Sequence, residues 1–257
     1  MFRTIEGFTV NTASFGNGER TIVGVGGWIG NWELWQQPFE ILSRSYRTVA
    51  YDHPGAGETV VPHEALTFDQ QVDTLVDLLD DFDIDRCVLA GESNGGTTAI
   101  AAASRQPERF EALVLVDSPI SDFDNEPTRQ FVDALRADHE GAMRAFVDFC
   151  IPEAGAEHLK RWLLRILMRP DVETAVALLE AMSDVDLRPI LPEIGIPTLV
   201  VMGELDALPN NGVAVAEETV GLLPDAQLHV VDGAGHVPTL TRPGEVAGAV
   251  EAFLAQT

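Results

Sequence analysis

Short apolar runs alternate with amphipathic stretches along most of the chain. The runs are apolar on both faces and are bounded by Gly, Pro, Asp or Asn, as expected for strands that helices cover on both sides. This alternation predicts βαβ units and a mainly parallel sheet. Strands are expected at Arg20–Val25, Arg47–Tyr51, Arg86–Ala90, Ala112–Val116, Thr198–Met202 and Gln227–Val231, with an antiparallel edge pair around Phe2–Ile5 and Phe8–Ser14.

Segments of helical period fill the gaps between these runs. Residues 67–70 read Thr-Phe-Asp-Gln, the form of a capping box, and apolar residues recur at helical spacing behind them as far as Phe82. A helix over Ser93–Arg105 is rich in small residues, which permit close packing on a sheet. Glu245–Leu254 is expected to form the last helix.

The alternation stops between about residues 122 and 186, where no strand-like run occurs. An all-helical insertion between two strands predicts a lid over one end of the sheet. No repeat or linker divides the chain, so residues 1–257 are expected to form a single domain with the lid inserted at 122–186. Its helical segments are Phe131–Leu135, Met143–Phe149, Leu159–Met168 and Val172–Met182.

The composition adds a strong negative charge to this picture. Asp and Glu number 41 against 16 Lys and Arg, which gives a net charge of −25 in 257 residues. Such a surface repels nucleic acid and anionic membranes, so neither is expected as a partner.

Nothing in the sequence points to export or to a membrane. No run reaches the roughly 18 apolar residues of a membrane span, and residues 1–6 lack the pattern of a signal peptide. We therefore expect a cytoplasmic protein, either a monomer or a homodimer. Cys87 and Cys150 are interpreted as buried apolar side chains, because two cysteines make no disulfide framework.

The strongest chemical signal is Gly-Glu-Ser-Asn-Gly at residues 91–95, which follows an apolar run and opens a small-residue helix. Gly-x-Ser-x-Gly in that setting predicts a nucleophile elbow centred on Ser93. A serine on such a tight turn has strained dihedral angles, and the glycines two residues away remove Cβ atoms that would clash. The hydroxyl would then project above the sheet.

A serine nucleophile needs a base at neutral pH, and the base needs an acid that fixes its tautomer. Asp206 and His236 each lie just beyond a predicted strand, in the chain order serine, acid, base. Asp117 also follows a strand and is the rival acid, although a turn role in Asp-Ser-Pro would explain it equally. Asp206 is preferred because Gly203-x-x-Asp206 lies where an acid loop is expected.

The other histidines lack a comparable setting. His229 lies inside a predicted strand, and the remaining four lie in the helical insertion or in loops, where His53 is a lesser candidate for the border of the site. None has the spacing of a metal site, so neither a metal nor a cofactor is expected.

Acyl transfer also needs two backbone N–H groups directed at the developing oxyanion. One is expected from Asn94, the residue after the nucleophile. The other is expected from Trp28, because the glycines around it permit close approach of the backbone to a ligand. Gly27 and Trp28 are accordingly predicted to bind substrate, although an ordinary glycine turn would have the same sequence.

With these motifs in place, the chain resembles the α/β-hydrolase superfamily over essentially its whole length, and most of all its compact, lid-bearing esterases and lactonases. The elbow, the Gly-x-x-Asp acid loop and the Gly-His base loop all match. Residues 52–59 are similar to the family turn Asp-x-Arg-Gly-x-Gly-x-Ser, with Pro54 in place of Arg. The oxyanion loop departs from the family: it usually reads His-Gly-x, whereas residues 26–28 read Gly-Gly-Trp, so the histidine that braces this loop is missing.

The resemblance implies a twisted, mostly parallel sheet flanked by helices, with a helical lid. It also implies a serine hydrolase that cleaves an uncharged or weakly polar carboxylic ester or lactone through an acyl-enzyme on Ser93. Two alternatives stay open. One is a carbon–carbon bond hydrolase or cofactor-free oxygenase with the same triad, which a wide aromatic pocket would favour. The other is a ligand-binding receptor with negligible turnover.

Overall fold

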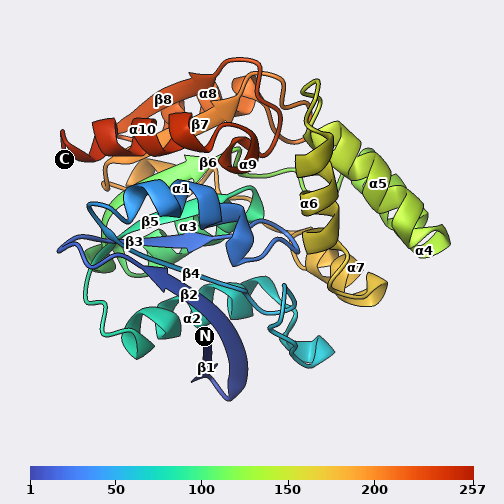
Figure 1. Ribbon diagram of the computed structural model, residues 1–257, viewed down its shortest axis with the longest axis horizontal. Helices are drawn as coiled ribbons and strands as arrows, with labels where there is room; N and C mark the ends of the chain where they lie inside the picture. The colour runs from blue at the N-terminus through green and yellow to red at the C-terminus, as the bar shows by residue number, and fades with distance from the viewer.

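A single eight-stranded sheet runs through the computed structural model, which describes residues 1–257 (Figure 1). Its strand order is β1-β2-β4-β3-β5-β6-β7-β8. The β1–β2 and β2–β4 pairs are antiparallel, and all other neighbours are parallel. The predicted α/β architecture is confirmed. The strands are β1 (Phe2–Ile5), β2 (Phe8–Phe15), β3 (Thr21–Val25), β4 (Arg47–Tyr51), β5 (Cys87–Glu92), β6 (Phe110–Val116), β7 (Thr198–Gly203) and β8 (Ala226–Val231).

Helices cover both faces of the sheet because successive residues of the central strands are apolar and point to opposite sides. One buried apolar cluster joins the sheet to α2 (Phe68–Asp81), α3 (Asn94–Arg105) and α8 (Val213–Leu222). A second cluster, on the other face, joins it to α1 (Gln36–Leu42) and α10 (Pro243–Leu254). Neither α1 nor α8 was predicted from the sequence.

Five short helices complete these layers and connect the strands. They are the 3₁₀ helices η1 (Trp32–Trp35), η2 (His63–Ala65), η3 (Pro107–Arg109) and η4 (Leu191–Glu193), and the short α9 (Pro238–Thr241). No helix of the protein combines the length and the apolarity needed to cross a bilayer.

Four helices that follow β6 and precede β7 in the sequence lie together at one end of the sheet (Figure 1). They share a third apolar cluster, which also includes Trp28 from the loop after β3. The side chains of Asn125, Asp138 and Asp171 accept backbone N–H groups at the starts of α4, α5 and α7, so local capping fixes where these helices begin. The four are α4 (Glu126–Ala137), α5 (His139–Cys150), α6 (Glu157–Leu167) and α7 (Val172–Glu180).

Candidate active site

The turn between β5 and α3 has the strained geometry of a nucleophile elbow. Ser93 has φ 52° and ψ −129°, a region that residues with a side chain rarely adopt. A Cβ atom at Gly91 would lie 2.4 Å from the carbonyl oxygen of Gly95, and one at Gly95 would lie 2.4 Å from that of Val25. Glycine is therefore required on both sides of the serine for the turn to close.

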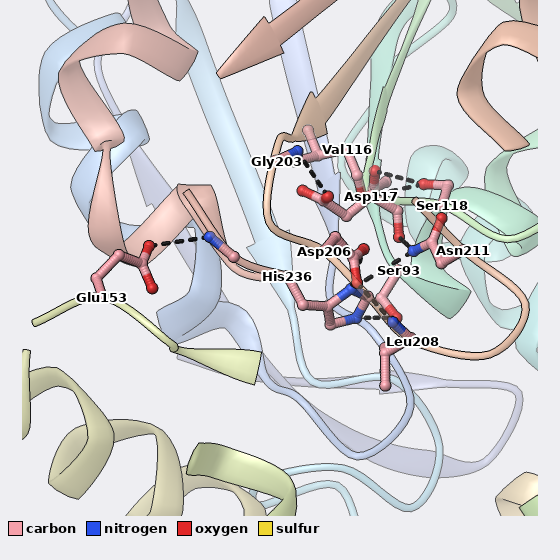
Figure 2. A network of polar contacts seen from close by, with 12 residues as sticks. Ser93, Val116, Asp117, Ser118, Glu153, Gly203, Asp206, Leu208, Asn211 and His236 are labelled. Atoms are coloured by element: carbon pink, nitrogen blue, oxygen red, sulfur yellow. Dashed lines mark hydrogen bonds and ion pairs between the residues drawn. The ribbon is translucent and has the colours of Figure 1, made fainter. Parts of the chain in front are cut away.

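Ser93, His236 and Asp206 form a continuous hydrogen-bonded chain (Figure 2). The hydroxyl of Ser93 lies 3.0 Å from Nε2 of His236, and Nδ1 of His236 lies 2.8 Å from Oδ2 of Asp206. The other carboxylate oxygen of Asp206 accepts the N–H of Leu208 at 3.1 Å. The loops after β5, β7 and β8 thus bring together the three residues that the sequence placed in a triad.

Burial and charge set the protonation of this chain. Burial disfavours the charged imidazole, but the negative charge of Asp206, its hydrogen bond and the charge of Glu92 together raise the pKa of His236. Burial likewise acts against ionised Asp206, yet the charge and hydrogen bond of His236 hold the pKa of Asp206 below its usual value. The carboxylate therefore holds the proton of the ring on Nδ1, and Nε2 is left to accept from the serine.

The oxyanion loop lies directly against the nucleophile. A Cβ atom at Gly27 would come within 2.6 Å of the Ser93 Cβ, so only glycine permits this approach. The backbone N–H groups of Trp28 and Asn94 have no acceptor within the protein, as expected of donors kept for a ligand. Trp28 has φ 25°, a strained value for a non-glycine residue.

Two buried side chains hold this loop in place of the histidine that its sequence lacks. Glu92, within the elbow itself, accepts the N–H of Gly27 at 3.2 Å. His53, also buried, lies against the backbone of Gly27 and Trp28, and its Nδ1 is 3.2 Å from the carbonyl oxygen of Pro54. Burial lowers the pKa of His53, although polar groups around it act in the opposite direction. Burial raises the pKa of Glu92 to about 7, although the charge of His236 and the N–H of Gly27 act to lower it.

The indole of Trp28 ties the predicted oxyanion loop to helices α4, α5 and α7. Its Nε1–H donates to the carbonyl oxygen of Ala175 in α7 at 2.8 Å. The ring packs edge-on against Phe131 of α4 and Phe146 of α5, with centroids 5.6 and 5.5 Å away. The two phenyl rings stack on each other at 5.2 Å.

The loop that carries His236, the predicted base, is attached to the same helical segment. The N–H of His236 donates to the carbonyl oxygen of Cys150 at the end of α5, at 2.8 Å. The preceding N–H, of Gly235, donates to Oε1 of Glu153 at 3.0 Å (Figure 2). Residues 122–186, the predicted lid, therefore contact both the loop of His236 and the loop of Trp28.

Comparison with known proteins identifies the family. The family model described as "Alpha/beta hydrolase family" matches residues 22–249. The chain belongs to this family.

Similar proteins match this hydrolase over nearly its full length. A strigolactone esterase of Pisum sativum is 28% identical over 94% of the chain and 95% of its own length. A 3-oxoadipate enol-lactonase of Acinetobacter baylyi is 26% identical over 98% of the chain and 95% of its own. The crystal structure of an enol-lactonase from Burkholderia xenovorans covers 99% of the chain and 100% of its own, with a TM-score of 0.91 at 22% identity. The structural likeness shows the fold, and the relatives support hydrolase activity.

A cavity of about 390 Å³ lies above Ser93 and His236 in this hydrolase. Its walls are the lid helices α4, α5 and α7 and the loop that follows Asp206. No Lys, Arg, Asp or Glu lines it. Trp28 forms part of the wall, whereas Gly27, the other residue predicted to bind substrate, is not among the lining residues of this cavity. The aromatic lining is Trp28, Phe123, Phe131, Phe146 and Phe149.

Asp117, the rival acid, lies beside the triad of the hydrolase without a hydrogen bond to His236. One of its carboxyl oxygens accepts the N–H of Gly203 at 2.8 Å (Figure 2). Asp117, Asp206 and His236 bring potential metal ligands within 4.8 Å of one another. Both ring nitrogens of His236 are already hydrogen-bonded, Nδ1 to Asp206 and Nε2 to Ser93.

Sequence reasoning missed three polar residues at this site. Asn211 donates to the backbone oxygen of Asp117 at 2.6 Å and lies 3.4 Å from Nδ1 of His236. The only hint of this role in the sequence is that Asn211 lies in the loop that follows Asp206. Glu92 was visible as a charged residue at the end of an apolar strand, but no role was assigned to it. His53 was considered only for the border of the site.

Proposed function

We propose that this hydrolase is a serine esterase or lactonase that cleaves uncharged carboxylic esters through an acyl-enzyme on Ser93. The observation that carries the proposal is the hydrogen-bonded chain of Ser93, His236 and Asp206 opening into an apolar cavity. Such a chain supplies a nucleophile, its base and the acid that orients the base.

Acylation begins when Oγ of Ser93 attacks the carbonyl carbon while Nε2 of His236 accepts the hydroxyl proton. The imidazolium that forms is stabilised by Asp206 at 2.8 Å. The negative charge on the carbonyl oxygen is received by the free N–H groups of Trp28 and Asn94. Nε2 then gives its proton to the alkoxy oxygen as the ester bond breaks and the alcohol leaves.

Deacylation repeats these steps with water as the nucleophile. Nε2 accepts a proton from water, the hydroxide attacks the acyl carbon, and the proton returns to Oγ of Ser93 as the acid departs. Glu92 and His53 hold the oxyanion loop through both steps. Two fixed donors matter because losing one typically costs about 10²–10³ in rate.

The cavity defines the class of substrate. Because no cationic side chain lines it, a carboxylate or phosphate group on the substrate would be buried without a partner, at a high energetic cost. The five aromatic side chains instead suit an apolar or weakly polar group. Neutral esters and lactones of moderate size therefore fit best.

The aromatic lining also keeps the carbon–carbon bond hydrolase as the second candidate. That reaction uses the same triad on a ketone, and its carbon leaving group is protonated in place of an alcohol. A flat, conjugated diketone would fill an aromatic cavity well, so such substrates belong in the same screen as esters and lactones. The receptor alternative requires binding in this cavity with negligible turnover.

Labelling and turnover together test the proposal. A fluorophosphonate should label the protein once, at Ser93, and Ser93→Ala should abolish labelling and lower the hydrolysis of p-nitrophenyl esters or lactones by about 10³-fold or more. Ser118→Ala is the matched control, because this buried serine lies nearby and bonds only to backbone oxygens. Labelling elsewhere, or an active Ser93→Ala variant, contradicts the assignment. Labelling of Ser93 with no turnover of any ester, lactone or diketone favours the receptor.

A further inference from the structure

Three of the six non-glycine residues with positive φ closely follow neighbouring strands of the sheet. Trp28, Ser93 and Asp117 all have positive φ, with values of 25°, 52° and 45°. They follow β3, β5 and β6, which lie side by side. Strain of this kind persists where the surroundings enforce it and gathers at functional sites. Two of the three residues already belong to the proposed chemistry, and Asp117 is the third.

The carboxyl group of Asp117 lies against that of Asp206. Asp117 is completely buried, and one of its oxygens accepts the N–H of Gly203. Its second oxygen, Oδ2, is buried and has no donor within the protein. One ligand atom each of Asp117, Asp206 and His236 lies within 4.8 Å of the others, so two buried carboxyl groups are close neighbours.

Two ionised carboxylates at this distance would repel each other strongly in a buried site. Asp206 is the one held ionised, because His236 and the N–H of Leu208 both donate to it. Asp117 accepts a single hydrogen bond, at Oδ1, and no donor compensates a negative charge on its Oδ2. A proton on Oδ2 removes the repulsion and converts the unpartnered oxygen into a donor, for which the neighbouring Asp206 carboxylate is an acceptor.

We propose that Asp117 is a positioning residue which stays neutral and donates a hydrogen bond from Oδ2 to Asp206, fixing the carboxylate that orients His236. The inference rests on the proposed serine mechanism, in which Asp206 must hold one rotamer through the cycle. With this proposed bond, the carboxylate of Asp206 accepts three hydrogen bonds, from the ring of His236, the N–H of Leu208 and the carboxyl group of Asp117.

The electrostatic surroundings agree with a neutral Asp117. Burial, followed by the negative charge of Asp206, raises its pKa well above the ordinary value, and the N–H of Gly203 opposes this only in part. The titratable groups that face it are Asp206 after β7, His236 after β8, Glu92 at the end of β5 and the thiol of Cys150 at the end of α5.

Two substitutions separate a neutral donor from a charged carboxylate. In Asp117→Asn, the amide oxygen accepts from Gly203 and the amide N–H donates to Asp206, so turnover should fall by less than about threefold and the pKa of His236 should stay in place. In Asp117→Ala, Asp206 loses a donor, and turnover should fall about tenfold or more, as expected for one hydrogen bond to a charged group. Asp206 then holds the imidazolium more strongly, so the acid limb of the pH profile moves to higher pH.

The readouts are kcat and kcat/KM between pH 5 and 9, and the pKa of His236 from NMR of its ring nitrogens. Asp232→Asn is the control, since this exposed acid lies in the same loop as His236 and should change neither. Thermal unfolding of each variant shows that it is folded. The NMR titration needs no turnover, so it tests Asp117 even where Ser93 is not labelled and no ester is hydrolysed.

A fall in the pKa of His236 in Asp117→Asn would mean that a negative charge was removed, and would overturn the proposal. So would an Asp117→Asn variant as impaired as Asp117→Ala. If both variants lose stability but keep the wild-type pH profile and kcat, Asp117 is only structural and the proposal is also overturned.

Discussion

Glu92 makes stability depend on pH in a way that one substitution should remove. Its side chain is 1% exposed, and burial raises its pKa from the ordinary value of 4.5 to about 7. The folded protein therefore keeps this proton up to about pH 7, whereas the unfolded chain loses it near pH 4.5. As pH rises between these values, stability falls, because the unfolded state has released a proton that the folded state still binds.

The size of the effect follows from the two pKa values. The interval from 4.5 to about 7 corresponds to about 3 kcal/mol at 1.36 kcal/mol per pH unit. Glu92→Gln has no proton to lose, and its amide oxygen still accepts the N–H of Gly27. The stability of the variant relative to wild type should therefore rise by about 3 kcal/mol between pH 4.5 and pH 8 and then stay constant. In a protein of this size that is a relative gain in Tm of roughly 6–12 °C.

Urea unfolding at half-unit steps from pH 4.5 to 8.5 measures this difference. Glu108→Gln serves as the control, because Glu108 is exposed and accepts no hydrogen bond from a side chain. Stability curves for Glu92→Gln and wild type that run parallel in pH would refute the reasoning. Around and above pH 7, where Glu92 becomes ionised, the wild type carries a negative charge near His236 that the variant lacks, so the acid limb of the variant's activity profile should lie at lower pH.

Three further predictions concern turnover. Trp28→Ala should widen the range of acyl groups accepted while hydrolysis of a small ester stays within about tenfold, since the backbone donor survives; a large loss with acetate esters would contradict this, and Trp28→Phe isolates the bond to Ala175. Asp206→Asn should lower kcat by about 10³–10⁴-fold with an unchanged circular dichroism spectrum, far more than Asp117→Asn, and the reverse ranking would make Asp117 the acid. In wild type, kcat/KM should rise with pH through a midpoint above 6.5, because the raised pKa of His236 must be passed before the ring is neutral; a profile flat down to pH 4 would argue against this base.

The sheet and the three residues of the predicted triad could be predicted from the sequence. The local apolar pattern indicates the strands, and a rule about the topology of parallel sheets indicates which residues meet. Apolar runs fixed the strands to within a residue or two. The carboxyl ends of parallel strands meet at one edge, so Ser93, Asp206 and His236 were expected near one another. The helices α1 and α8 were missed because α1 spans only seven residues and includes a proline, and the sequence of α8 separates its apolar from its polar positions only weakly.

The residues that hold the site in place could not be predicted from the sequence, because their roles depend on contacts between loops that are distant in the chain. Glu92 acts through the N–H of Gly27, 65 residues away. The loop after Asp206 brings Asn211 to the backbone of Asp117, 94 residues away. A sequence motif shows which residues follow a strand, but not which oxygen of a carboxyl group faces which donor in the folded chain.

The attachment of residues 122–186 to the loops of Trp28 and His236 has a consequence for protein engineering. A graft that exchanges residues 122–186 for those of a relative changes the walls of the cavity and also replaces three supports of the active site. Two of these, at Cys150 and Ala175, are backbone carbonyl groups and survive in any graft that keeps the helix ends in register. The third, the carboxylate of Glu153, must be carried over explicitly. Donor sequences for such chimaeras are therefore best chosen by helix length and by an acid at this position, ahead of overall identity.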